Sequence, residues 1–305
     1  MNQPAATMTA PPGAGPELIG TVELDESTSN GPSRSPWYER LAHHVVTTIR
    51  LSLGTVGRSA QLSAEVLRYS VVDLVRLRLP MLEVLTQTWT LLKVTALPAL
   101  LMAVPLGAEV SVQVGGLMNQ VGASSLAGAA SGLGVISQGA PMATGLLMSG
   151  AAASAVASDL GARTIREEID AMRVMGIDPV ERLVMPRFIA MIFIAPILCI
   201  VIIAAGVFAG LTIAVTVNDV VPGSFWQSLG AFATTTDVAF AMLKALAFAA
   251  LVVLVASLRG LEAKGGPRGV ADAVNASVVL SVVCIFITNL VITQLQSMFF
   301  PAQIS

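Results

Sequence analysis

Charged residues are scarce in this chain of 305 residues, of which they make up 12%. A soluble domain carries about twice that share, so this chain has too few polar groups to cover a water-exposed surface of its size. Hydrophobic residues account for 54% of the sequence, and the mean hydropathy is +0.78. We therefore expect an integral membrane protein. One membrane bundle explains the length better than two soluble domains.

Residues that build catalytic and metal sites are equally scarce. His43 and His44 are the only histidines, and two adjacent side chains do not converge on one ligand. The only cysteines, Cys199 and Cys284, lie in apolar runs and form neither a disulfide framework nor a metal site. No Gly-Lys dipeptide occurs, which excludes the phosphate-binding loop of many nucleotide hydrolases. We expect no enzyme activity and no metal or cofactor bound by this chain. The net charge of −2, without a basic stripe, gives no case for nucleic acid as a partner.

The first part of the chain differs from the rest in composition. Residues 1–36 are rich in Pro, Ala, Gly, Ser and Thr and lack an apolar run, so we expect a disordered tail and no signal peptide. In residues 37–86, apolar residues recur at helical spacing and six arginines interrupt them. This pattern is typical of amphipathic helices that lie in the membrane interface, and a soluble helical hairpin is the alternative. The membrane domain then occupies residues 87–305.

Five apolar runs in that domain are long enough to span a bilayer, which takes about 20 residues. The sequence thus predicts an all-α integral membrane fold. The expected spans are residues 89–114, 123–158, 188–217, 238–258 and 273–297. Pro98 and Pro105 predict a kink or break in the first span. The dipeptides Gly115-Gly116 and Pro222-Gly223 predict turns.

The positive charges predict an orientation. Residues 34–78 contain seven Lys and Arg, residues 163–187 contain five, and residues 259–268 contain three, which is 15 of the 17. Five spans place these three segments on the same side of the membrane. The positive-inside rule then puts the N-terminus in the cytoplasm and the C-terminus outside.

The second span carries small residues at four-residue spacing, which allow helix backbones to approach closely. This ladder consists of Gly145, Ser149, Ala153, Ala157 and Gly161. The pattern fits packing within one bundle as well as contact with a second subunit.

Two ionisable residues lie inside the expected spans. Burying a charge there costs about 3 kcal/mol or more, so Glu109 and Lys244 are functional candidates. They either pair across a polar cavity or each reach water or a headgroup.

The connection between the second and third spans predicts a short helix between two sharp corners. Thr164 and Glu167 have the spacing of a capping box. Gly176 is a natural helix stop. Asp178 then caps a further helix that has Pro179 at its first position.

The same helix has an apolar stripe, since Ile165, Ile169 and Met172 follow at helical spacing. Arg166 and Asp170 have the spacing of an ion pair beside it. An exposed stripe of this kind fits the groove of a partner protein. The alternative is a helix that lies on its own bundle or on the lipid surface.

These residues carry a resemblance to a known family. Residues 167–179 read Glu-Glu-Ile-Asp-Ala-Met-Arg-Val-Met-Gly-Ile-Asp-Pro, and residues 185–187 read Met-Pro-Arg. This sequence resembles the signature of the MlaE/YrbE permeases, the membrane subunits of ABC-type lipid transporters that work with MCE-domain proteins. The sequences of residues 160–173, and of residues 259–275 in the second loop, are most similar to those of the YrbE A-type subunits of actinobacterial mce systems.

The resemblance implies an interfacial elbow helix, five spans and a coupling helix at about residues 164–177 that docks on a separate ABC ATPase, which would supply ATP and Mg. It also implies a second YrbE-type permease, MCE-domain substrate-binding proteins on the outer face, and a membrane lipid as substrate. The residues implied in ATPase coupling are Arg166, Glu167, Glu168, Ile169, Asp170, Met172, Arg173, Gly176, Asp178 and Pro179. Those implied along the lipid pathway are Val104, Glu109, Ser111, Val112, Gly115 and Gln138.

The chain departs from the family pattern at residues 137–141. Related permeases have Arg-Glu-Leu-Gly-Pro in the second span, whereas this chain has Ser-Gln-Gly-Ala-Pro. A mechanism that depends on the Arg–Glu pair therefore does not transfer to this protein.

From the sequence we expect the permease subunit of an ATP-driven lipid importer in the plasma (inner) membrane. The lipid is a fatty acid, a mycolic-type lipid or a sterol. One competing hypothesis is an ion-gradient-coupled transporter that uses Lys244, Glu109 and Asp237. Another is a scaffold that anchors outer-face proteins.

Overall fold

The computed structural model describes residues 57, 64–66, 68 and 81–299. The expected tail at residues 1–36 and nearly all of the expected interfacial helices lie outside the described residues. The described part contains helices and no strand.

The second span is one long helical rod assembled from short pieces, whereas the other spans are single helices or nearly so. The first span is α2 (Met81–Gln120). The rod consists of η1 (Ser124–Leu126), α3 (Ala127–Gly134), η2 (Val135–Gly139), α4 (Ala140–Leu147), η3 (Met148–Ala152) and α5 (Ala153–Ile165), of which η2 and η3 are wide π-helical turns. After it come α6 (Glu168–Val174), η4 (Val180–Val184), α7 (Met185–Val217), α8 (Pro222–Phe232), α9 (Thr235–Leu261) and α10 (Pro267–Phe299).

Five helical segments of the described part are long and apolar enough to cross a membrane. They are Met81–Gln120, Ala127–Ile165, Val180–Val217, Thr235–Leu261 and Pro267–Phe299. The all-α integral membrane fold with five spans is thus confirmed. Each segment extends past the expected apolar run at one end or both, because a helix continues beyond the hydrocarbon layer with more polar residues.

Two expected turns are wrong. Helix α2 continues through Gly115 and Gly116, and a Cβ at Gly115 would lie 2.4 Å from Nδ2 of Asn218. Gly115 therefore allows a neighbouring side chain to approach and does not end the helix. Pro222 starts the short helix α8, where its missing N–H has no intrahelical partner in any case. Helix α2 also remains one helix through both of its prolines.

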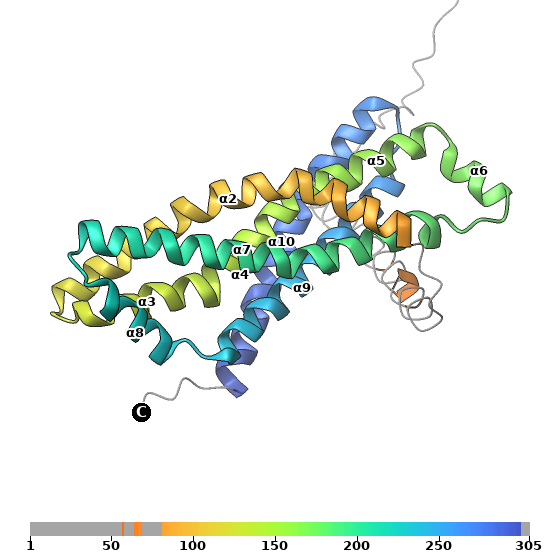
Figure 1. Cartoon of the computed structure of the whole chain (residues 1–305). Coiled ribbons are helices and arrows are strands. Elements are labelled where there is room, and N and C mark those ends of the chain that lie inside the picture. Colours follow the sequence, from red (N-terminus) through yellow and green to blue (C-terminus); the bar gives the residue numbers. More distant parts are fainter. Residues whose placement is uncertain (1–56, 58–63, 67, 69–80, 300–305) are drawn as a thin grey trace, which may run out of the picture. The chain divides into compact units, whose positions relative to one another are not determined.

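Helices α2 and α7 run side by side (Figure 1) at very short range. A Cβ at Gly107 would lie 2.0 Å from the carbonyl oxygen of Gly206, so only glycine fits there. One turn further on, Oγ of Ser111 donates a hydrogen bond of 2.8 Å to the carbonyl of Gly210. This contact joins the first and third spans backbone to backbone.

The small-residue ladder of the second span is buried throughout, and it packs within the bundle. Gly145 faces Phe248 of α9 and Ile285 of α10, while Gly161 faces Ala263 and Val270. Of the two alternatives, these contacts show packing against the protein's own helices.

Candidate functional site

The connection between α5 and α7 forms a short helix bounded by two left-handed residues. Helix α6 lies between Glu167, with φ of 60°, and Gly176, with φ of 76°. After α6, the N–H of Gly176 donates to the carbonyl of Arg173 at 3.0 Å and that of Ile177 to Met172 at 2.9 Å. These two bonds form a Schellman motif, so the helix stop expected at Gly176 is confirmed.

The predicted capping box is wrong. Thr164 belongs to the last turn of α5, where its Oγ1 donates to the carbonyls of Leu160 at 2.9 Å and Gly260 at 3.2 Å. Glu167 precedes α6 without a side-chain cap. The expected helix at residues 164–177 is therefore two helices, because α5 continues to Ile165 before the backbone turns.

The second corner has the predicted cap. Oδ1 of Asp178 accepts a hydrogen bond of 2.8 Å from the N–H of Val180, two residues later. Pro179 directly precedes the wide turn η4, which continues into α7. A short capped segment therefore connects α6 to α7.

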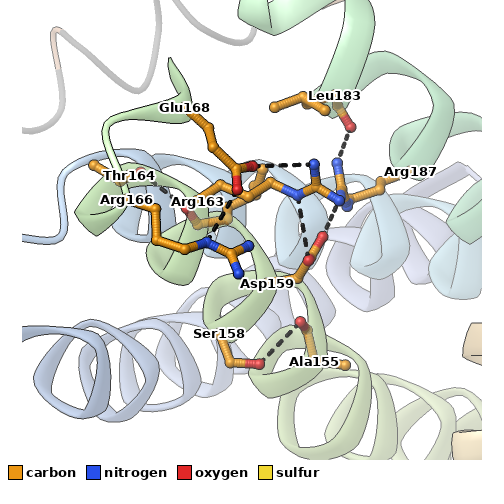
Figure 2. Close-up of polar contacts among 10 residues, drawn as sticks. Ala155, Ser158, Asp159, Arg163, Thr164, Arg166, Glu168, Leu183 and Arg187 are labelled. Carbon is orange, nitrogen blue, oxygen red and sulfur yellow. Dashed lines mark hydrogen bonds and ion pairs between the residues drawn. The ribbon is translucent and has the colours of Figure 1, made fainter. Parts of the chain in front are cut away.

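A chain of ion pairs fastens α6 to the ends of α5 and α7, as Figure 2 shows. Arg187 of α7 is 3% exposed and donates both to the Asp159 carboxylate of α5 and to the Leu183 carbonyl. Asp159 also pairs with Nε of Arg163 at 3.3 Å. Glu168 of α6 continues the chain, at 3.5 Å from Nη1 of Arg163 and 3.0 Å from Nε of Arg166.

The expected pair between Arg166 and Asp170 is absent. Arg166 pairs with Glu168 instead, and Asp170 pairs with Arg173 at 3.0 Å. The left-handed residue Glu167 interrupts the helix, so the four-residue spacing no longer brings Arg166 and Asp170 onto one face.

Asp159 and Arg187 are structural members of this site that the sequence analysis missed. They lie 28 residues apart at the ends of two spans, and their pairing follows from how those spans pack. A buried guanidinium is costly unless a carboxylate and further hydrogen bonds compensate it. The Asp159–Arg187 pair is therefore the most firmly held member of this series of ion pairs, which we call its fixed end. The other pairs are more exposed and individually weak.

The apolar residues of the connection face two ways. Ile169 is 3% exposed and packs in the core, with Met172 partly buried beside it. The expected exposure of this stripe is thus wrong, and of the two alternatives the helix lies on its own bundle. The exposed apolar residues are Val174, at 89%, followed by Met175 and Ile177. We call these three residues the α6 tip.

A hollow of about 420 Å³ separates α6 from the loop between α9 and α10. Asp170 and Arg173 line it on one side, and Lys264 with Gly265 and Gly266 on the other. The two loops therefore lie at the same end of the bundle.

The residues implied in the lipid pathway do not gather in one place. Val104 and Val112 are on the exposed face of α2, as is Glu109, whose Oε1 accepts from Nε2 of Gln113 at 3.2 Å. Ser111 and Gly115 are on the opposite face, packed against α7 and Asn218.

Gln138 lies on another span. Its side chain bonds to α10, with Nε2 3.2 Å from Oγ1 of Thr293 and Oε1 3.3 Å from Nδ2 of Asn289.

The three ionisable residues of the ion-gradient hypothesis also lie apart from one another. Lys244 is fully buried in α9 and donates to the carbonyl of Ser137 at 2.9 Å. Asp237 forms a capping box with Thr234 at the start of α9. Among the described residues, Lys244 makes no ion pair with Glu109.

Comparison with known proteins agrees with this architecture. The family model described as Permease MlaE matches residues 84–295. A probable ABC transporter permease of Synechocystis sp. is 30% identical over 191 residues, or 63% of this chain and 73% of that protein. The intermembrane phospholipid transport system permease protein MlaE of Haemophilus influenzae is 31% identical over 140 residues, or 46% of this chain and 54% of that protein.

A plant protein is also similar to this chain. The chloroplast protein TRIGALACTOSYLDIACYLGLYCEROL 1 of Arabidopsis thaliana is 29% identical over 153 residues, which are 50% of this chain and 44% of that protein. The matches thus span about half of the plant and Haemophilus proteins and nearly three quarters of the cyanobacterial one. The family match covers nearly all of the five spans and the whole connection that holds α6, and it places this chain in the MlaE permease family.

Proposed function

We propose that this protein is the permease subunit of an ATP-driven, MCE-type lipid importer, of the YrbE A-type. Its family and the phospholipid transport system to which its Haemophilus relative belongs support a lipid substrate. The apolar faces of the spans favour acyl chains or sterols, which need burial more than hydrogen bonds.

The positive charges support an orientation for the proposed importer. The connection around α6 and the loop between α9 and α10 line one hollow, and both are rich in Lys and Arg. The positive-inside rule places this end in the cytoplasm of a plasma (inner) membrane protein. The N-terminus is then cytoplasmic and the C-terminus outside.

The observation that carries the proposal is the attachment of α6. A separate ATPase, which binds ATP and Mg, would push on the α6 tip from the cytoplasm. Because Ile169 packs in the core and Glu168 is linked through Arg163 and Asp159 to Arg187, a push on α6 would be passed on to α5 and α7. The spans would then rearrange as rigid bodies.

The burial of Ile169 changes how the contact with the ATPase is proposed. Ile169 and Met172 anchor α6 to its own bundle, so the contact surface is the α6 tip. A small exposed apolar tip fits a groove in a partner. Asp170 and Arg173 flank it and give the contact its polar rim.

The proposed assembly contains two further kinds of partner, a second YrbE-type permease and MCE-domain proteins on the outer face. The exposed face of α2, with Val104 and Val112, is available for lipid or for the sister permease. Within the described residues, no contact of Lys244, Glu109 or Asp237 favours the ion-gradient alternative.

The test replaces the most exposed residue of the tip. Val174→Asp puts a charge into the proposed groove and should reduce ATPase co-purification about tenfold, which corresponds to about 1.4 kcal/mol. The matched control is Val121→Asp, since Val121 is also well exposed, at 72%, but lies between α2 and α3. Equal ATPase recovery with both variants would contradict docking through the tip.

A further inference from the structure

Lys244 has an environment that is unusual for a lysine. It has no exposed surface, although it lies within an apolar span. Within the part of the chain that the structure describes, it forms no ion pair. Its Nζ donates to the backbone carbonyl of Ser137 at 2.9 Å. A buried ammonium in a span is costly, so its single backbone contact needs an explanation.

The explanation lies four residues after Ser137. In an α-helix the carbonyl of Ser137 would accept from the N–H of residue 141, but residue 141 is a proline and has no N–H. Ser137 lies in the wide turn η2, where the N–H of Ala140 reaches back to the carbonyl of Val135. An unsatisfied carbonyl in the apolar layer costs several kcal/mol. Lys244 supplies the missing donor from a neighbouring helix.

The next residue shows what this bond holds in place. Gln138 directly follows Ser137, and its amide bonds to both Thr293 and Asn289 of α10. The two ends of the Gln138 amide are thus engaged, one as donor and one as acceptor. Fixing the Ser137 carbonyl fixes the direction in which Gln138 leaves the backbone.

We propose that Lys244 is a positioning residue that replaces the N–H missing at Pro141 and thereby holds Gln138 against α10. The second span, α9 and α10 are then linked by polar contacts that run from the buried Lys244 to the exposed side chain of Gln138. In this role the lysine acts as a hydrogen-bond donor and not as a carrier of ions or protons.

The first test restores the backbone donor. Lys244→Met removes the ammonium and keeps an apolar chain of similar length, and it should lower the Tm of the full-length chain in nanodiscs by about 5 °C. Pro141→Ala returns an N–H to the helix, so the double variant should regain at least half of that loss. Because Pro141→Ala adds no charge, rescue would not follow if the lysine acted through its charge.

The second test addresses Gln138. Gln138→Leu should lower the Tm in the wild-type background and lower it much less in the Lys244→Met background, because its partners are already misaligned there. An equal loss from Lys244→Met with and without Pro141→Ala would overturn the donor role. Fully additive losses from Lys244→Met and Gln138→Leu would overturn the positioning role.

Discussion

The pair between Asp159 and Arg187 allows the sharpest prediction about the site. Asp159→Asn keeps the shape of the side chain and removes its charge, which leaves the buried Arg187 guanidinium without its paired carboxylate. Removing one partner of a fully buried pair costs about 3–5 kcal/mol. Because Asp159 is 43% exposed, water compensates part of this loss, and we expect about 2 kcal/mol. At about 2–4 °C per kcal/mol, the Tm should fall by about 4–8 °C.

The assay is thermal unfolding of the full-length chain in nanodiscs, with Asp170→Asn as the matched control. Asp170 also pairs with an arginine at 3.0 Å, but both partners are well exposed, so this control should change the Tm by no more than about 2 °C. Exchange of the charges in Asp159→Arg with Arg187→Asp should recover part of the loss. Equal shifts for Asp159→Asn and Asp170→Asn would refute the assignment of Asp159–Arg187 as the fixed end.

Two further predictions concern backbone geometry, and the same unfolding assay measures both. Gly107→Ala should destabilise the protein by about 3 kcal/mol or more, because the new Cβ would lie 2.0 Å from the Gly206 carbonyl and force α2 and α7 apart. Gly116→Ala in the same helix, with nothing within 4 Å, should be neutral or slightly stabilising, and similar losses for both variants would contradict the close contact. Glu167→Gly should stabilise the protein by about 1 kcal/mol, since φ of 60° strains any residue with a Cβ, whereas Gly176→Ala at φ of 76° should cost about 1 kcal/mol. The same sign of change at both positions would argue against this backbone path.

The sequence predicted the five spans because their signal is local. An apolar run of about 20 residues has few alternatives to a membrane helix, and the stop at Gly176 and the cap at Asp178 likewise depend on adjacent residues. Pairing between spans is not local. No property of Asp159 or Arg187 alone indicates that they meet.

The errors have the same physical origin. The Gly115-Gly116 dipeptide is typical of a turn, but Gly115 lies inside α2, where it leaves room for the side chain of Asn218. Thr164 and Glu167 have capping-box spacing, but α5 continues through Thr164 because that residue packs against Gly260. Ile169 has the spacing of an exposed stripe, but it packs in the core of the bundle. In each case tertiary contacts override a pattern that the sequence shows correctly.

Purification of the tagged chain in mild detergent, followed by native mass spectrometry, tests the central claim most directly. We expect the chain to retain an ABC ATPase pair, a second permease, MCE subunits and a bound lipid, with the ATPase lost from the Val174→Asp variant. A stable chain recovered without an ATPase, in cells whose lipid uptake follows an ion gradient, would contradict the proposed importer.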